Sequence, residues 1–292
     1  MSLRIIPKTL RMAGEDQQLA EILQKTAAAE KGQALLFSEY GAYTVEGSRK
    51  AHSALSKAAI DCGVTIVTSL NLPTDDLPYA DENVNHNTLF IFSKNGKVYS
   101  PQAKITPQSF EMRHLDGKSP RMNVAPYSRL NRVKLRQNGR EYTAFFFICS
   151  DLYALRLFEY DELKAEAIIC TANFGNGAEE PAGELIKYSV ESGLFKQGFL
   201  CNSHQIVKNG ITPLTLAVER VFPDSAEKKP YAKDEMEKRV NNASAVYPDE
   251  KHCNFQSMLK LTRNGTFTIP QSRSIENGLK VKLGSYARMI EL

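Results

Sequence analysis

The chain has 292 residues, of which 42% are hydrophobic and 24% charged. This is the ordinary composition of a globular protein with a sizeable core. The formal net charge of +4 comes from lysines and arginines that are scattered and mostly accompanied by acidic residues. Nucleic-acid-binding proteins concentrate such charge on one face. The sequence also lacks the roughly 18 consecutive apolar residues of a membrane-spanning helix. We therefore expect a globular protein with neither a nucleic-acid nor a membrane partner.

The cysteine pattern indicates a reduced setting. The number of cysteines is odd, their spacings in the sequence are long, and no C-x-x-C pair occurs. These features argue against a disulfide framework and against a zinc site. The N-terminus has no apolar stretch long enough for a signal peptide. We expect a cytoplasmic protein without a bound metal. The cysteines are Cys62, Cys149, Cys170, Cys201 and Cys253.

The first third of the chain alternates helical and strand patterns. Apolar residues at helical spacing predict a helix over Asp16–Lys31, which Gly32 ends. The short apolar run Ala34–Phe37 has the length of a strand. A second helix fits Arg49–Cys62, and the β-branched run Val64–Leu70 predicts a buried strand. Alternation of this kind is typical of an α/β architecture.

Hairpins follow these units. An Asn-Gly pair between two apolar, β-prone runs is a strong signal for a tight turn joining antiparallel strands. Three places carry the signal: Thr88–Phe92 with Lys97–Tyr99, Arg132–Leu135 with Tyr142–Ile148, and Ser257–Leu261 with Thr266–Ile269.

The remaining pattern predicts helices, strands and one irregular region. Residues 210–254 are rich in proline and charge, and we interpret them as an irregular insertion. Because no flexible linker divides the chain, residues 1–292 are expected to form a single domain in which two sheets lie between helices. The further predicted elements are helices over Ala154–Lys164 and Glu184–Phe195, and strands over Ala167–Cys170, Phe199–Val207 and Leu279–Leu283.

Three strand ends carry residues with chemistry. Leu35-Leu36-Phe37-Ser38 leads into Glu39, Val98-Tyr99-Ser100-Pro101-Gln102-Ala103 leads into Lys104, and Phe145-Phe146-Phe147-Ile148 leads into Cys149. In that order and at those separations, these motifs resemble the carbon–nitrogen hydrolases of the nitrilase superfamily. That family places a Glu at the end of its second strand, a Lys after a β-hairpin, and a Cys on a strand-to-helix elbow.

The resemblance covers more than the triad. Asn87–Ile91 looks like the start of the family's hairpin before the Lys, and Ala167–Phe174 looks like the strand after the Cys helix. The resemblance covers roughly Asp16–Asn209 and Gln256–Leu283. The family's usual first strand is poorly represented by Leu3–Leu10. The resemblance implies a four-layer α-β-β-α sandwich of nitrilase type, mixed α/β (α+β) in class. It also implies a homodimer or higher homo-oligomer and no metal or organic cofactor.

The chain departs from the family pattern beside two of these residues. A His-Leu pair often follows the Lys in the family, and here Ile105-Thr106-Pro107 stands instead. An aromatic residue commonly follows the Cys, where this chain has Ser150. The region 210–254 has no counterpart in the pattern.

The resemblance assigns roles to the three residues. Cys149 is expected to attack an amide carbonyl and form a thioester, which replaces one hard step with two easier ones. A polar pocket can lower the pKa of such a cysteine. Glu39 is expected to move the protons, a role typically worth about 100- to 10,000-fold in rate. Lys104 and a backbone N–H after Cys149 are expected to bind the developing oxyanion.

Further residues enter by the same resemblance. Many family members use a second Glu to orient the Lys, and Glu111 stands in a suitable position, with Glu82 and Glu141 left open. The segments after Glu39 and after the strand that follows Cys149 are expected to face the substrate cleft. Their candidate substrate-binding residues are Tyr40, Tyr43, Asn173 and Phe174.

The predicted function is hydrolysis of a non-peptide C–N bond in a small molecule. Linear amides or N-carbamoyl compounds are the expected substrate class, and nitriles stay open. One alternative is a catalytically silent relative that serves as a small-molecule-binding or regulatory subunit. The other is a papain-like thiol hydrolase using Cys149 with His204 or His252, although the local cysteine signature of that family is absent.

Overall fold

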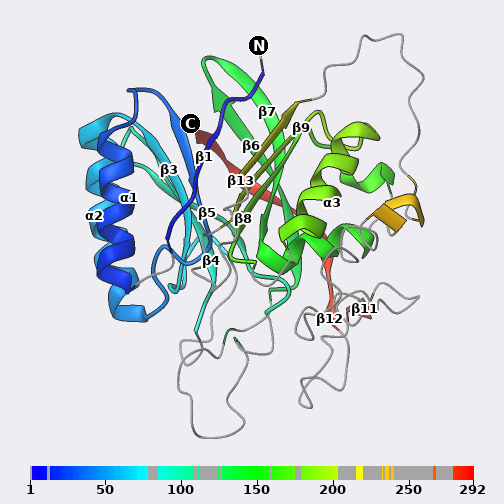
Figure 1. Cartoon of the computed structure of the whole chain (residues 1–292), viewed down its shortest axis with the longest axis horizontal. Helices are drawn as coiled ribbons and strands as arrows, with labels where there is room; N and C mark the ends of the chain where they lie inside the picture. The colour runs from blue at the N-terminus through cyan, green and yellow to red at the C-terminus, as the bar shows by residue number, and fades with distance from the viewer. Residues whose placement is uncertain are drawn as a thin grey trace, which may run out of the picture.

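Two β-sheets pack face to face, and helices cover the outer face of each sheet (Figure 1). This computed structural model describes residues 2–11, 14–77, 85–107, 111, 124, 127–157, 160–174, 179–202, 215–219, 232, 234–236, 238–239, 266–267 and 279–292. Within these ranges the layers are α-β-β-α, which confirms the predicted fold class. Among the described helices, none is long and apolar enough to cross a membrane.

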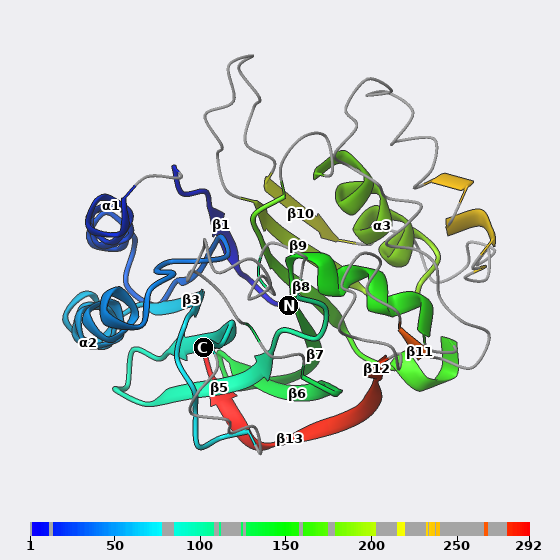
Figure 2. The same cartoon turned by 90° about the horizontal axis from the view of Figure 1, so that it is seen from below.

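The first sheet has the strand order β1-β2-β3-β4-β5. Strands β1 to β3 are parallel, and β4 and β5 form the predicted antiparallel hairpin. Helices α1 and α2 lie side by side on its outer face (Figure 2). The weakly predicted first strand is present but short. The elements are β1 (Ile6–Lys8), α1 (Glu15–Ala27), β2 (Ala34–Phe37), α2 (Val45–Cys62), β3 (Thr65–Leu70), β4 (Thr88–Phe92) and β5 (Val98–Ala103).

The second sheet has the order β10-β9-β8-β7-β6-β13. Strands β7, β8 and β9 are parallel, and β6 and β7 form the second predicted hairpin. Its turn residues Asn138 and Gly139 both have positive φ, 52° and 75°, as a tight hairpin turn of this type requires. The strands are β6 (Arg129–Gln137), β7 (Arg140–Ile148), β8 (Ala167–Ala172), β9 (Gln197–Asn202), β10 (Thr215–Glu219) and β13 (Lys282–Glu291).

Alternating side chains of the strands build three apolar layers. In β7, Phe146 and Ile148 point into the core between the two sheets, whereas Phe145 and Phe147 point outward. The outward residues pack under helix α3 (Glu179–Glu191) and the 3-10 helices η1 (Cys149–Leu157) and η2 (Tyr160–Leu163). In β2, Leu35 and Phe37 likewise point toward α1 and α2. Burial on both faces explains why the strands read as continuous apolar runs.

The segment after Cys149 differs from the prediction. The α-helix predicted over Ala154–Lys164 is wrong, because the chain forms η1 and η2 there. Apolar residues three or four apart fit either kind of helix, so the pattern does not separate them. The chain therefore winds more tightly just where it leaves the candidate nucleophile.

The C-terminal region also corrects the prediction. Residues 215–219, inside the supposed irregular insertion, form β10, which pairs antiparallel with β9. The final strand extends well beyond Leu279–Leu283: β12 (Leu279–Lys280) is followed by β13, which pairs parallel with β6. In the third predicted hairpin, β11 (Thr266–Phe267) pairs with β12, and the arm 257–261 lies outside the described residues.

Candidate active site

The three predicted triad residues each follow a strand at the same end of the sandwich. Glu39 comes after β2, Lys104 directly after β5, and Cys149 directly after β7. The Glu39 backbone N–H donates to the Ala172 carbonyl at the end of β8, 3.2 Å away, which ties the two sheets together at this end. The residues that follow strands of both sheets thus lie together at one end of the sandwich.

A sharp turn holds the Glu39 backbone. Tyr40 adopts a left-handed conformation with φ of 59°, and its N–H donates to Ser69 Oγ at 3.0 Å. A Cβ at Gly41 would lie 2.8 Å from Thr68 Oγ1, so only glycine fits against β3 there. The turn lets the chain reverse directly after Glu39 while the carboxylate stays buried.

Cys149 sits on a strained elbow. Its φ of 53° lies in the left-handed region, which costs a residue with a Cβ about 1–2 kcal/mol. Strain of this kind persists where the surrounding structure holds it, and it is concentrated at functional sites. The conformation turns the chain from β7 into η1 at the cysteine itself.

The charged side chains form one buried cluster. Lys104 Nζ lies 2.5 Å from Glu39 Oε1 and 3.0 Å from Glu111 Oε1. The exposed fractions are 1% for Lys104, 2% for Glu39 and 0% for Glu111. The structure thus brings Glu111 to the lysine. Of the other candidates, Glu82 lies outside the described residues, and Glu141 makes a surface ion pair with Arg136.

Asn87 completes the cluster, and the sequence did not single it out. It precedes β4, and its Nδ2 donates to Glu39 Oε1 at 2.8 Å and to Glu111 Oε1 at 3.2 Å. Two carboxylates fix the orientation of this amide, since a flipped oxygen would face both negative charges. Its Oδ1 has no hydrogen-bond partner in the part of the chain that the structure describes. The only available signal was a polar residue beside the hairpin that leads to Lys104.

These contacts make the two oxygens of Glu39 unequal. Oε1 accepts hydrogen bonds from Lys104 and Asn87. Among the described residues, Oε2 accepts none. One oxygen therefore anchors the carboxylate, and the other is open to take a proton.

Burial sets the pKa values of the candidate base and nucleophile. It raises the pKa of the Cys149 thiol well above its ordinary value; the Glu39 charge adds to this, and the Lys104 charge and the Asn173 backbone N–H oppose it. The expected lowering is therefore wrong for the protein without substrate. Burial also raises the pKa of Glu39, although Lys104 pulls it down. A protonated thiol thus faces a carboxylate with enhanced basicity.

Lys104 and Tyr40 keep their protons. Burial acts against the Lys104 ammonium, but the carboxylates of Glu111 and Glu39 outweigh it and raise its pKa well above the ordinary value. Burial, reinforced by Glu111, raises the pKa of Tyr40 well above its ordinary value. The Tyr40 hydroxyl donates to Glu111 Oε1. The cluster is thus a cation held between two carboxylates, with a tyrosine and an asparagine as neutral donors.

The four predicted substrate-binding residues divide into groups. Tyr40 lies in the cluster as a partner of Glu111, and Asn173 contacts the thiol through its backbone. Phe174 is buried in the same apolar layer as Cys149. The Tyr43 backbone instead bonds to Glu15 and Asn71, near the start of α2.

Asp151 is a second residue that the sequence did not single out. It is fully buried two residues after Cys149, and burial raises the pKa of Asp151 to about 7. Its Oδ1 accepts from the backbone N–H of Ile105 at 2.9 Å and of Thr106 at 2.7 Å. A carboxylate from the cysteine segment therefore binds the residues that directly follow Lys104.

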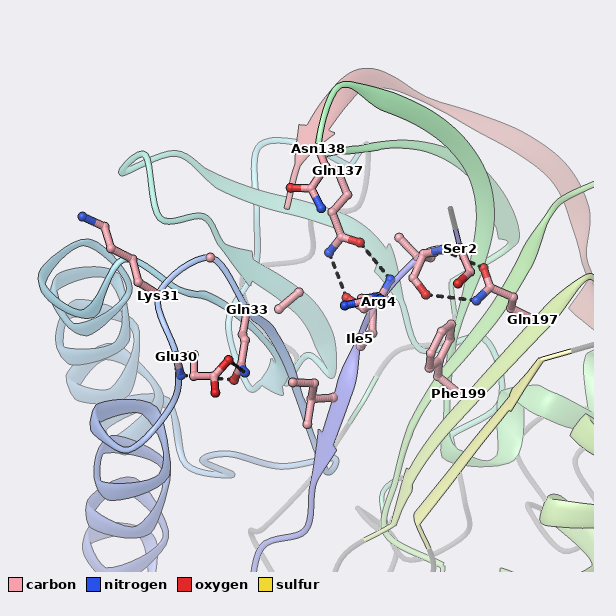
Figure 3. A pocket seen from close by; sticks show the side chains of 14 residues that line it. Ser2, Arg4, Ile5, Glu30, Lys31, Gln33, Gln137, Asn138, Gln197 and Phe199 are labelled. Atoms are coloured by element: carbon pink, nitrogen blue, oxygen red, sulfur yellow. Dashed lines mark hydrogen bonds between the residues drawn. The ribbon is translucent and has the colours of Figure 1, made fainter.

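A cavity of about 650 Å³ lies at the other end of the sandwich (Figure 3). It is lined by residues 2–6 and 30–34 together with Gln137, Asn138, Gln197 and Phe199, and none of the predicted site residues belongs to it. Glu30 and Gln33, both in its lining, hydrogen-bond to each other. Its lining contains no cysteine and none of the residues of the buried ion cluster, so the candidate site lies at the opposite end.

Comparison with known proteins places this fold. No protein-family model matches the chain, and no curated protein matches it. Among solved structures, it is similar to an amidase from Nesterenkonia sp. (19% identity, covering 69% of this chain and 76% of that chain, TM-score 0.50). A variant of the Nesterenkonia sp. AN1 amidase, with the acetamide moiety of fluoroacetamide added covalently at its active-site cysteine, is 16% identical (74% and 81% covered, TM-score 0.52).

Another variant of that amidase, described as from the nitrilase superfamily, is 17% identical (83% and 95% covered, TM-score 0.51). At these identities the comparisons establish the fold. Together with the strand order and the layers, they confirm the architecture that the sequence motifs suggested. The chain has the fold of the carbon–nitrogen hydrolases of the nitrilase superfamily.

Proposed function

We propose that this protein is a carbon–nitrogen hydrolase of amidase or N-carbamoyl amidase type, with Glu39, Lys104 and Cys149 as its catalytic residues. The observation that carries the proposal is the buried lysine between two carboxylates, beside a cysteine on a strained elbow. Burying three charges costs free energy that well-packed apolar side chains would save. Such an arrangement is understandable where the charges perform chemistry.

The first half of the reaction is acylation. Cys149 Sγ attacks the carbonyl carbon while Glu39 Oε2 takes the thiol proton, so no free thiolate has to form beforehand. Negative charge develops on the carbonyl oxygen and is bound by the Lys104 ammonium and the Ser150 backbone N–H. The C–N bond then breaks, Glu39 returns its proton to the leaving nitrogen, and ammonia or an amine departs.

The second half is hydrolysis of the thioester. Glu39 takes a proton from a water molecule, and the resulting hydroxide attacks the thioester carbon at the same oxyanion position. The C–S bond breaks, the thiolate regains its proton from Glu39, and the carboxylic acid is released. Glu111, Tyr40 and Asn87 hold Lys104 and Glu39 in place throughout.

A substrate screen with matched variants tests the proposal. Ammonia release is measured for short aliphatic amides, N-carbamoyl amino acids and nitriles. Glu39→Gln is expected to lower kcat about 100- to 10,000-fold, and Lys104→Met about 100- to 1,000-fold. Cys149→Ser should abolish turnover. Cys201→Ser, which changes another buried cysteine, in the core between the sheets, should not.

Alkylation distinguishes a silent site from an active one without knowledge of the substrate. Iodoacetamide resembles a small amide, and it is expected to label Cys149 in the wild type in a manner that depends on Glu39. Peptide mass mapping locates the adduct. Absence of both turnover and Glu39-dependent labelling would favour the alternative of a binding or regulatory subunit.

Several wider properties remain part of this proposal. We propose one domain over residues 1–292, a homodimer or higher homo-oligomer, and a reduced, cytoplasmic setting. The described cysteines Cys62, Cys149, Cys170 and Cys201 are all free thiols, as a reduced setting requires. Light scattering of the purified protein measures the oligomeric state.

A further inference from the structure

The segment after Lys104 and the segment after Cys149 are cross-linked by three buried polar side chains. Thr106, Ser150 and Asp151 are 0%, 1% and 0% exposed. We call these three residues the lysine–cysteine bracket. Two of its members directly follow Cys149, and the third stands two residues after Lys104. The bracket therefore joins the backbones beside two proposed catalytic residues.

The hydrogens of the bracket can be assigned one by one. The Thr106 hydroxyl donates to Asp151 Oδ1 at 2.9 Å and lies 3.0 Å from Ser150 Oγ. The Ser150 hydroxyl donates to the Thr106 carbonyl at 2.7 Å. Asp151 Oδ1 also accepts from two backbone N–H groups of the lysine segment. Each hydroxyl thus donates its proton across the gap, and neither side chain is free to rotate without breaking a buried bond.

The bracket also explains the two departures from the family pattern. The sequence differs from that pattern at Ile105-Thr106 and at Ser150. The two differences lie far apart in the chain, but the hydroxyls of Thr106 and Ser150 contact each other. We therefore interpret them as one coupled change, in which a hydroxyl pair joins the two segments.

We propose that Thr106 and Ser150 are positioning residues, which set the distance between the two oxyanion donors, Lys104 Nζ and the Ser150 backbone N–H. The inference rests on the proposed function. Oxyanion donors act within about 2.7–3.1 Å of the developing charge, and a misplacement of about 1 Å costs on the order of 100-fold in rate. A hydroxyl pair that connects the backbones of both donors controls this distance directly.

Two substitutions that each remove a hydroxyl without adding a larger side chain test the proposal. Thr106→Val and Ser150→Ala each remove one hydroxyl, and each is expected to lower kcat about 10- to 100-fold while KM changes little, because the donors act in the transition state. The double variant should be at least as slow as the slower single variant, since the two changes remove different hydrogen bonds between the same two segments. Thr106→Ser restores the hydroxyl and should recover most of kcat.

Controls separate positioning from general damage. Thr65→Val removes a buried hydroxyl that has no partner within the described ranges, and it should leave kcat unchanged. The rate of Cys149 alkylation by iodoacetamide should also stay at the wild-type value in the bracket variants, because alkylation forms no oxyanion. If Thr106→Val does not fold, Ser150→Ala carries the same test without added volume.

The outcomes distinguish this inference from the proposed function. Wild-type turnover with unchanged kcat in folded Thr106→Val and Ser150→Ala overturns the bracket alone. A raised KM at constant kcat, or a double variant that is faster than the slower single variant, also overturns it. A wild type that neither turns over amides nor reacts at Cys149 removes the proposed function, and the inference with it.

Discussion

The two ends of the sandwich solve the problem of buried polar groups in opposite ways. At the end with Cys149, an ammonium and two carboxylates meet within 3.0 Å. At the other end, two neutral glutamine side chains hydrogen-bond to the backbone of the residues just before β1. Figure 3 shows this for Gln137 and Arg4. Gln197 holds Leu3 in the same way, accepting from its N–H and donating to its carbonyl, both at 3.0 Å.

The difference lies in what each arrangement leaves unused. Each glutamine donates one hydrogen bond to this backbone and accepts one from it, so the backbone groups are satisfied. We call this the amide-clamped end. Leu3 and Ile5 there belong to the core between the sheets. The charged end leaves Asn87 Oδ1 without a partner among the described residues, and it holds Cys149 at a strained φ. Strain at a cysteine beside a buried ion cluster fits the proposed active site, although the cavity of about 650 Å³ lies at the other end.

The largest expected effect on stability is at the charged end. Lys104→Met leaves two buried carboxylates without their cation, which should lower the free energy of unfolding by about 3–5 kcal/mol. Urea denaturation measures it. Adding Glu39→Gln and Glu111→Gln to this variant should recover part of the loss. Lys57→Met, at an exposed ion pair with Asp61, is the control and should cost at most about 1 kcal/mol. A similar cost for both lysines would contradict the electrostatic account.

The pH dependence of kcat/KM probes the same end through Glu39. The reaction needs the ionised carboxylate, and burial raises its pKa, so activity should fall on the acid side from a pH above the ordinary carboxyl range. Below that pH, kcat/KM should drop about tenfold per pH unit. Because the pKa of Cys149 is also raised, no thiol limb should appear near pH 9. Asp151 titrates at about 7, and an acid limb that persists in Asp151→Asn belongs to Glu39.

The amide-clamped end should respond in stability alone. Gln197→Ala leaves the N–H and carbonyl of buried Leu3 unpaired, at a cost of about 1–3 kcal/mol. Gln137→Ala should cost less, because its partner Arg4 is exposed and water can replace the amide. Neither change should alter kcat. Denaturation curves combined with the amide assay check both statements, and a lowered kcat in folded Gln197→Ala would show that the two ends are coupled.

The smallest expected effect is at Thr65, where β3 begins at the amide-clamped end. No described residue bonds to its buried hydroxyl, so Thr65→Val removes an unsatisfied group and keeps the shape. The free energy of unfolding should stay constant or rise by up to about 1 kcal/mol. The thermal midpoint measures the change. A clear loss of stability would mean that the hydroxyl has a partner after all.

The sequence by itself determined the local parts of this protein. Strands β2 and β3 and the two Asn-Gly hairpins around Gly96 and Gly139 were predicted in place. Helices α1 and α2 were predicted too, although α1 ends at Ala27 instead of Lys31 and α2 begins at Val45 instead of Arg49. Their signals are apolar periodicity and turn residues, which act over a few neighbouring positions. The fold class followed from the order of these elements and from the motifs around Glu39, Lys104 and Cys149.

Only the tertiary structure decided what depends on distant segments meeting. The 3-10 winding after Cys149, strand β10 inside the supposed insertion, and the full length of β13 each depend on contacts that local patterns do not contain. The parts played by Asn87 and by the lysine–cysteine bracket have the same origin. The pKa of Cys149 is the clearest case. Its direction depends on how deeply the thiol is buried and on the charges beside it, and packing between remote strands sets both.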